Sequence, residues 1–350
     1  MTITFPDFLT QLLTNPSFAI TVLLVLASVF VNGWHDAPNA IATCVATRAM
    51  EAKPAIVMAA VFNFLGALVM TSVSASVAQT IYSMVDFGGD AHSALIALCA
   101  ALFAIVVWSV GTWYFGLPSS ASHALIAGLT GGAIAIQNGL DGVNGAEWIK
   151  VIYGLVLSAL LGFLFGFVVV KLVGKVFSSI DRRRTTSFFK GGQIASGALM
   201  AFMHGAHDGQ KFMGIFLLGC FLAQGEAGVT NFHIPIWLMV LCSLTMGLGT
   251  SIGGYRIIKA VGMGMVKLET WQGFSADIGA SLVLFLATIT GIPVSTTQSK
   301  TTCIMGAGAA KRLSNVNWSL AGNMVLTWVL TFPGCGLIGY IMVKLALLFI

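Results

Sequence analysis

The chain has 350 residues, of which 57% are hydrophobic and 8% are charged. This composition excludes a soluble globular domain of that length, because too few polar residues are present to cover a water-facing surface. The formal net charge of +5 does not indicate a nucleic-acid partner, since the basic residues cluster in short connections between apolar runs. Those runs approach the roughly 20 residues that cross a bilayer as a helix, which indicates a multi-pass membrane protein.

Ten apolar segments are expected to be membrane helices. They span about 17–48, 54–82, 91–115, 118–138, 148–176, 191–223, 233–254, 271–290, 293–311 and 318–343. We therefore predict an all-α integral membrane protein with about 10 to 12 transmembrane helices. No cleaved signal peptide is expected, because no basic segment precedes the first apolar run. The six cysteines stand singly in apolar segments and are expected to be small buried residues rather than disulfides or zinc ligands.

Basic residues fall in alternate connections. They are Arg48, Lys53, the Lys and Arg residues of 171–190, Arg256, Lys259, Lys267, Lys311 and Arg312. The connections 83–90, 139–147 and 224–232 contain acidic residues but no Lys or Arg. The positive-inside rule then places the basic connections in the cytoplasm and both termini outside. The protein is expected to lie in the cell inner (plasma) membrane.

Two motif pairs show that the sequence is duplicated. "GWHDAP" begins at Gly33 and "GAHDGQ" at Gly205, while "GLPSSASH" begins at Gly116 and "GIPVSTTQ" at Gly291. Five crossings per half is an odd number, so the second half enters from the opposite face and forms an inverted repeat. We expect a first repeat at 1–176, a basic cytoplasmic linker at 177–190 and a second repeat at 191–350. Helices are expected to break at the motifs, and whether 118–138 and 293–311 cross fully or form hairpins stays open.

The His–Asp dipeptides lie at membrane depth, where an ionised Asp costs roughly 2.5–3.5 kcal/mol. Asp36 and Asp208 should therefore face a polar cavity. One interpretation is that each carboxylate only caps a half-helix at a kink. The functional interpretation is that Asp36, Asn39 and Asp208 hold a coupling cation, and that His35 and His207, which titrate near neutral pH, make this cation a proton.

The matched "PSSASH" and "PVSTTQ" elements place hydroxyl groups after a proline. Pro118 and Pro293 can each open a helix at its first turn, where free backbone donors bind anions. The alternative is that the hydroxyls bond the carbonyl one turn back or allow close helix packing. Because the element occurs in both halves, the sequence favours a shared oxyanion site.

Two lysines lie within the expected membrane segments. Lys211 follows Asp208 by three residues, so it can pair with that carboxylate on a helix or act as a point charge for an anion. Lys300 lies seven residues past Pro293 and is expected to extend from a helix end to the membrane surface, with the alternative that it too is a point charge for an anion.

Two further residues have weaker signals. His204 precedes His207 by one turn, and the H-x-x-H-D pattern could bind a transition metal, but the sequence places no third soft ligand, so no metal site is predicted. Asp277 follows Ser275 at an expected helix start and is interpreted as a cap.

The four motifs, taken together and in this order, resemble the signature of the inorganic phosphate transporter (PiT) family. That signature is a G-x-N-D-x-x-N/K element and a P-x-S-T-T-H element in each half, and the resemblance covers about 17–345. The segment "GWHDAPNAIATCVATRAM" looks like the bacterial low-affinity Pit branch, in which coupling is to protons and phosphate enters partly as a neutral metal phosphate complex. Two positions depart from the pattern, since His207 replaces the usual Asn and Gln298 replaces the final His.

The resemblance implies an anion pocket at the hydroxyl elements and ion sites at the Asp elements. The predicted phosphate-binding residues are Ser119, Ser120, Ser122, Ser295, Thr296, Thr297, Lys211 and Gln298. The predicted coupling-ion residues are His35, Asp36, Asn39, His207, Asp208 and His123.

The predicted function is secondary active symport of inorganic phosphate, coupled to protons. The expected partners are phosphate, a coupling cation and the lipid bilayer, with a homo-oligomer left open and no cofactor. The alternatives are a sodium-coupled phosphate or sulfate permease of the same fold, a passive anion channel, and an intramembrane metal-dependent hydrolase using His204, His207 and Asp208. A hydrolase would need no second, inverted copy of the His–Asp element, so we predict that the protein is not an enzyme.

Overall fold

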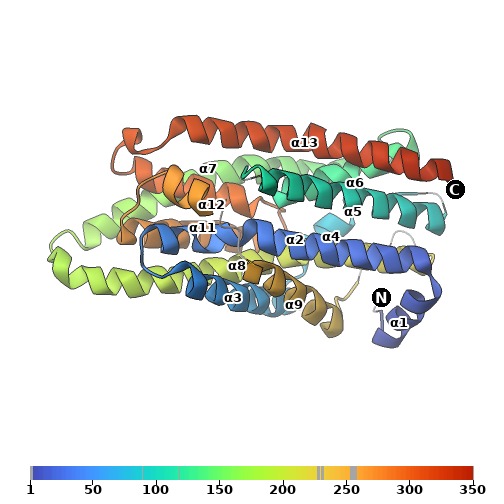
Figure 1. Ribbon diagram of the computed structural model, residues 1–350, viewed down its shortest axis with the longest axis horizontal. Helices are drawn as coiled ribbons and strands as arrows, with labels where there is room; N and C mark the ends of the chain where they lie inside the picture. The colour runs from blue at the N-terminus through green and yellow to red at the C-terminus, as the bar shows by residue number, and fades with distance from the viewer. Residues whose placement is uncertain are drawn as a thin grey trace.

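The computed structural model describes residues 3–88, 90–117, 119–226, 229, 232–252 and 258–349. The described chain is helical, and its long helices lie side by side along one axis (Figure 1). Helix α1 and the C-terminal end of α13 lie at one end of the bundle, and the connection from α7 to α8 lies at the other (Figure 1). Isolated β-bridges join Val85 to Val143 and Val266 to Val316, and they connect loop segments.

The elements follow one another in this order: α1 (Phe5–Thr14), α2 (Pro16–Ala46), α3 (Ala52–Val73), α4 (Ser76–Tyr82), α5 (Ala91–Tyr114), α6 (Ala121–Gln137), α7 (Gly145–Val176), α8 (Arg182–Ala223), α9 (Ile236–Ile252), the π-helix η1 (Lys259–Gly264), α11 (Thr270–Thr290), α12 (Thr296–Ala309), the 3-10 helix η2 (Leu313–Asn315), α13 (Trp318–Ala346) and the 3-10 helix η3 (Leu347–Phe349). Pro118 and Arg256, which the sequence interpretation used, lie outside the described residues.

Among the residues that the structure describes, six helices are long and apolar enough to cross a membrane, namely α2, α3, α5, α7, α11 and α13. The outer helix α7 exposes Ile149, Leu160 and Leu172, with 54%, 63% and 56% of each residue accessible. Large apolar side chains exposed along a whole helix fit a lipid environment. All six cysteines are free thiols; five are buried and Cys99 is half-buried.

The predicted breaks in the first and sixth membrane segments are wrong. Helix α2 runs without interruption through the first His–Asp motif with Pro38 inside it, and α8 runs through the second. The glycines of these motifs serve close packing instead, since a Cβ at Gly33 would lie 2.3 Å from the Met246 carbonyl oxygen and one at Gly205 would lie 2.1 Å from that of Asn63. A helix can therefore keep its hydrogen bonds while a neighbouring backbone approaches it.

The interruptions lie elsewhere. The expected 54–82 segment is divided into α3 and α4, and both α6 and α12 begin in the middle of the bundle. Helix α12 has 14 residues, which is about 21 Å at 1.5 Å per residue and too short to cross about 30 Å of hydrocarbon. Residues 182–190, which were predicted to belong to the linker, lie in α8.

Helices from the two halves of the chain pack in exchanged pairs. Helix α2 contacts α9 while α3 contacts α8, and α6 contacts α13 while α7 contacts α12. Each half therefore completes the packing of the other, and the starts of α6 and α12 meet in the centre.

Candidate functional site

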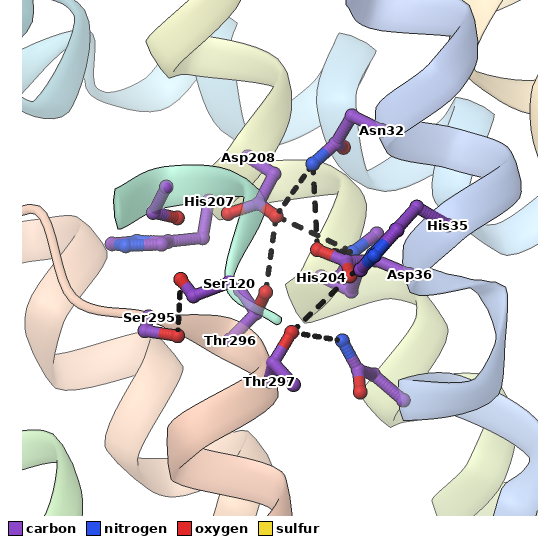
Figure 2. A network of polar contacts seen from close by, with 12 residues as sticks. Asn32, His35, Asp36, Ser120, His204, His207, Asp208, Ser295, Thr296 and Thr297 are labelled. Carbon is purple, nitrogen blue, oxygen red and sulfur yellow. Dashed lines mark hydrogen bonds and ion pairs between the residues drawn. The ribbon is translucent and has the colours of Figure 1, made fainter. Parts of the chain in front are cut away.

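The first part of the candidate site is supplied by α2. Asp36 is 2% exposed, and its Oδ1 atom lies 2.8 Å from His35 Nδ1. Thr297 Oγ1 on α12 donates to the same carboxylate at 3.2 Å, and Asn39 Nδ2 donates to Thr297 Oγ1 at 3.0 Å (Figure 2). The other nitrogen of His35, Nε2, lies 3.2 Å from Ser119 Oγ.

The second part comes from α8. Lys211 Nζ donates to Asp208 Oδ1 at 2.7 Å, to Ser122 Oγ at 2.6 Å and to the Val294 carbonyl oxygen at 2.7 Å. These three acceptors match the three donors of an ammonium group. Of the two roles open to Lys211 from the sequence, the structure shows the pair with Asp208, and it brings the hydroxyl of Ser122 to the same ammonium.

The two carboxylates share neighbours. Asn32 Nδ2 donates to Asp36 Oδ2 at 3.4 Å and to Asp208 Oδ2 at 3.3 Å. His204 Nε2 lies 3.4 Å from Asp208 Oδ2 and 3.9 Å from Asp36 Oδ2 (Figure 2). One ligand atom from each of Asp36, His204 and Asp208 falls within 4.8 Å of the others, so the halves of the chain meet at a single ionic cluster.

Two helix N-termini face this cluster. Ser120 is the N-cap of α6 and accepts from the His123 amide, and Ser295 is the N-cap of α12 and accepts from the Gln298 amide. Ser295 Oγ donates to Ser120 Oγ at 2.7 Å (Figure 2). The starts of both helices therefore meet, although the serine cap rather than Pro293 opens α12.

The hydroxyl next to the α12 cap reaches the other carboxylate. Thr296 Oγ1 donates to Asp208 Oδ2 at 3.0 Å. Because Thr297 Oγ1 donates to Asp36, two successive residues at the start of α12 contact the carboxylates of both halves of the chain.

Three predicted site residues make their contacts outside the carboxylate cluster. His207 Nδ1 lies 3.0 Å from Thr288 Oγ1, and its Nε2 donates to the Val294 carbonyl oxygen at 3.2 Å. The ring of His123 packs on Phe332 at 4.9 Å between centroids. The side-chain oxygen of Gln298 accepts from Ser158 on α7 at 2.9 Å.

Sequence reasoning missed one residue of the cluster and undervalued another. Asn32 was not singled out, and His204 was considered only as a metal ligand. Each stands four residues before an Asp, at the spacing that puts two side chains on one face of a helix. That spacing was the available signal, but it is informative only once α2 and α8 are known to be unbroken.

The interpretations of Lys300 and Asp277 were wrong. Both residues are 0% exposed and form an ion pair inside the protein. Lys300 does not reach the membrane surface because α12 starts in the bundle centre, which leaves the lysine in the core. The N-cap of α11 is Glu269, which forms a capping box with Gln272.

A bundle of apolar helices that holds charged groups and two helix ends at its centre is typical of membrane transport proteins. The chain belongs to the Phosphate transporter family, which matches residues 32–339. It is 38% identical over 325 residues to the "Probable low-affinity inorganic phosphate transporter" of Bacillus subtilis, covering 92% of this chain and 96% of that one. A relative of the same description in Rhizobium meliloti is also 38% identical, covering 92% of this chain and 95% of the relative.

A solved structure has the same fold. "The sodium-dependent phosphate transporter" matches with a TM-score of 0.87 and 22% sequence identity, covering 95% of this chain and 100% of that chain. Together with the apolar spans found in the described part of the chain, the family shows a multi-pass membrane transporter of phosphate.

Proposed function

We propose that the protein takes up inorganic phosphate as a proton-coupled symporter of the plasma membrane. The observation that carries the proposal is the 2.7 Å contact between the N-cap hydroxyls of Ser120 and Ser295, beside a cluster of two carboxylates. Helix N-termini present free amide donors and a partial positive charge to an anion. The relatives named as low-affinity inorganic phosphate transporters support phosphate as that anion.

The anion would lie between the starts of α6 and α12. Its oxygens would accept from the hydroxyl groups of both helix starts, and Lys211 would supply a positive charge. The residues proposed to contact phosphate are Ser119, Ser120, Ser122, Lys211, Ser295, Thr296 and Thr297. These groups would replace the hydration shell that the anion loses on entering the bundle.

The charge of the cluster supports coupling to a cation. With Asp36 and Asp208 ionised and Lys211 protonated, the site has a net negative charge, which repels an anion. A proton on His204 or on Asp36 would remove that charge when phosphate binds. Each net positive charge carried inward gains about 2.3 kcal/mol per 100 mV of membrane potential.

Sodium is the second candidate for the coupling ion. The structural neighbour is named sodium-dependent, and Asp36, Asp208, Thr296 and Thr297 place oxygen atoms close together. Oxygen ligands suit hard cations, whereas an uncharged imidazole adds nitrogen to the set. The histidine between the carboxylates is the reason for preferring the proton.

The exchanged packing of helices supports two inverted repeats and alternating access by rocking of one repeat against the other. The positive-inside rule favours cytoplasmic basic connections and external termini.

Uptake of labelled phosphate into proteoliposomes tests the proposal. An inward proton gradient without sodium is expected to concentrate phosphate, and sulfate in excess is expected to compete poorly. Accumulation that requires sodium and ignores the pH gradient would replace the proton by sodium. Loss of uptake after chelation of divalent cations would indicate that a metal phosphate complex is the cargo.

A further inference from the structure

Polar side chains continue beyond the central cluster along α2 and α12. Asn39 contacts Thr297, and one helical turn further on each helix stand Thr43 and Lys300. Lys300 Nζ donates to Thr43 Oγ1 at 3.3 Å. The two helices therefore face each other with polar side chains over a second turn, and all four of these side chains are buried. We call the residues Asn39, Thr43, Thr297 and Lys300 the polar seam.

The second turn holds the Asp277–Lys300 ion pair. Thr43 Oγ1 lies 2.8 Å and 2.9 Å from the two carboxylate oxygens of Asp277, Ser196 Oγ donates to Asp277 Oδ2 at 3.3 Å, and Gln193 Nε2 also donates to that oxygen. The side-chain oxygen of Gln193 is buried and has no hydrogen-bond partner among the described residues. The carboxylate is thus held by three neutral donors besides the lysine.

The first half of the chain builds the corresponding place without charges. The hydroxyl elements repeat at an offset of 175 residues, and the same offset relates Asp277 to Leu102 and Lys300 to Leu125. Both leucines are 0% exposed and belong to the apolar core. Because a buried ion pair is weak evidence for stability when apolar residues can fill the same volume, packing alone does not explain the pair.

The polar seam ends at a cavity. Thr47, one turn beyond Thr43, donates to the Thr43 carbonyl oxygen at 2.8 Å and lines a cavity of about 620 Å³ with Arg48, Phe189, Trp271 and Lys311. A Cβ at Gly273 would lie 2.2 Å from the Gln193 side-chain oxygen and 3.1 Å from Thr47 Cγ2. Gln193, which binds Asp277, therefore lies next to the cavity. The cavity is at the end of the bundle where the basic connections lie.

We propose that this cavity is the cytoplasmic vestibule of the phosphate route and that Asp277 and Lys300 form an inner relay site between it and the central cluster. The inference rests on the proposed phosphate transport. With no anion present, the pair closes the seam, since separating it would leave two buried charges unpaired. An anion leaving the α6–α12 site takes the place of Asp277 as the partner of Lys300, while Thr43, Ser196 and Gln193 hold the carboxylate.

The test uses the Asp277→Asn/Lys300→Met double variant in the full-length protein. Removing both charges avoids an unpaired ion, so we expect unchanged thermal stability in detergent and phosphate binding at the central cluster within about threefold of the unaltered chain. Uptake is expected to fall at least about tenfold, because the anion then crosses the seam without a counter-charge. The Glu147–Lys150 pair, in which the Lys150 side chain is 47% exposed and the Glu147 side chain 16%, gives the control, and Glu147→Gln/Lys150→Met should leave uptake unchanged.

Full uptake by the double variant would show that the pair is structural and would overturn the inference. If the variant does not fold, Asp277→Asn/Lys300→Gln, which keeps polar partners for Thr43, Ser196 and Gln193, replaces it in the same comparison. If the unaltered chain neither binds nor accumulates phosphate, the proposed function itself fails, which is a different result from loss of uptake with binding retained.

The vestibule is tested separately with Thr47→Cys in inside-out vesicles. A negatively charged, membrane-impermeant methanethiosulfonate reagent should block phosphate exchange, and phosphate should slow the modification. Leu313→Cys, an exposed position at the same end outside the cavity lining, should be modified without loss of exchange. Unaltered exchange after complete modification of Thr47→Cys would overturn the vestibule.

Discussion

Asp36 and Asp208 differ in how their charges are compensated. Asp208 pairs with Lys211 at 2.7 Å, whereas Asp36 has no Lys or Arg partner among the described residues and is contacted by His35, Asn32 and Thr297. A buried carboxylate without a permanent counter-charge is the group that gains most from binding a proton or another cation. Asp36 is therefore the carboxylate whose charge we expect to change during transport.

Asp36→Asn and Asp208→Asn should both abolish phosphate accumulation, but for different reasons. Asp36→Asn removes a cation-binding charge and should leave the protein stable. Asp208→Asn leaves Lys211 buried and unpaired, which costs about 3–5 kcal/mol, so the melting temperature should fall as well. Uptake in proteoliposomes and thermal unfolding in detergent measure the two effects, with the exposed Asp141 changed to Asn as the control. Full accumulation by Asp36→Asn would refute its assignment.

His204, rather than His207, should carry the pH response of transport. His204 Nε2 lies 3.4 Å and 3.9 Å from the two carboxylates, whereas His207 contacts Thr288 and the Val294 carbonyl oxygen. His204→Gln is expected to reduce proton-driven accumulation at least about tenfold, because it removes the titratable imidazole beside the two buried carboxylates. Phosphate uptake by His207→Gln should still respond to an imposed pH gradient. The reverse result, measured as phosphate uptake against external pH, would move the proton site to His207.

At the scale of helices, α2 and α8 show how one sequence signal can have two meanings. Glycines and a proline around His–Asp motifs predict a break, yet both helices continue, because the glycines admit the backbones of α9 and α3. A single sequence does not say which neighbour approaches a glycine. For the same reason Lys300 was misplaced, since only the packed bundle shows that α12 starts in the centre.

Gly205→Ala tests the close packing of α8 on α3. The new Cβ would lie 2.1 Å from the Asn63 carbonyl oxygen, so the helices must separate, at a cost of about 1–3 kcal/mol. Uptake should fall too, because the Asn63 side-chain oxygen lies 3.0 Å from His204 Nδ1. Gly191→Ala on the same helix meets nothing within 4 Å and should be neutral or slightly stabilising. Equal melting temperatures for the two variants would contradict this account of Gly205.

For the whole molecule, the sequence predicted an all-helical bundle, and this prediction is confirmed. The repeated motifs also indicated which residues to examine, since Asp36, Asp208, Ser120 and Ser295 come together from distant parts of the chain. The contacts made by Asn32 and the Asp277–Lys300 pair could not be predicted, because they join helices whose relative rotation and depth are set by packing and not by any local pattern.

The topology of the molecule gives the last prediction. Helix α1 and the end of α13 lie at the end of the bundle opposite the α7–α8 connection (Figure 1), and Arg48 and Lys311 line the cavity together with residues of that connection. Since basic connections remain in the cytoplasm, epitopes added to either terminus should bind antibody on intact spheroplasts. Ser178→Cys, at an exposed position of the α7–α8 connection, should react with an impermeant thiol reagent only after the membrane is opened. An N-terminal and a C-terminal epitope on opposite faces would contradict the paired, inverted arrangement, because two halves with equal numbers of crossings return the chain to the side from which it entered.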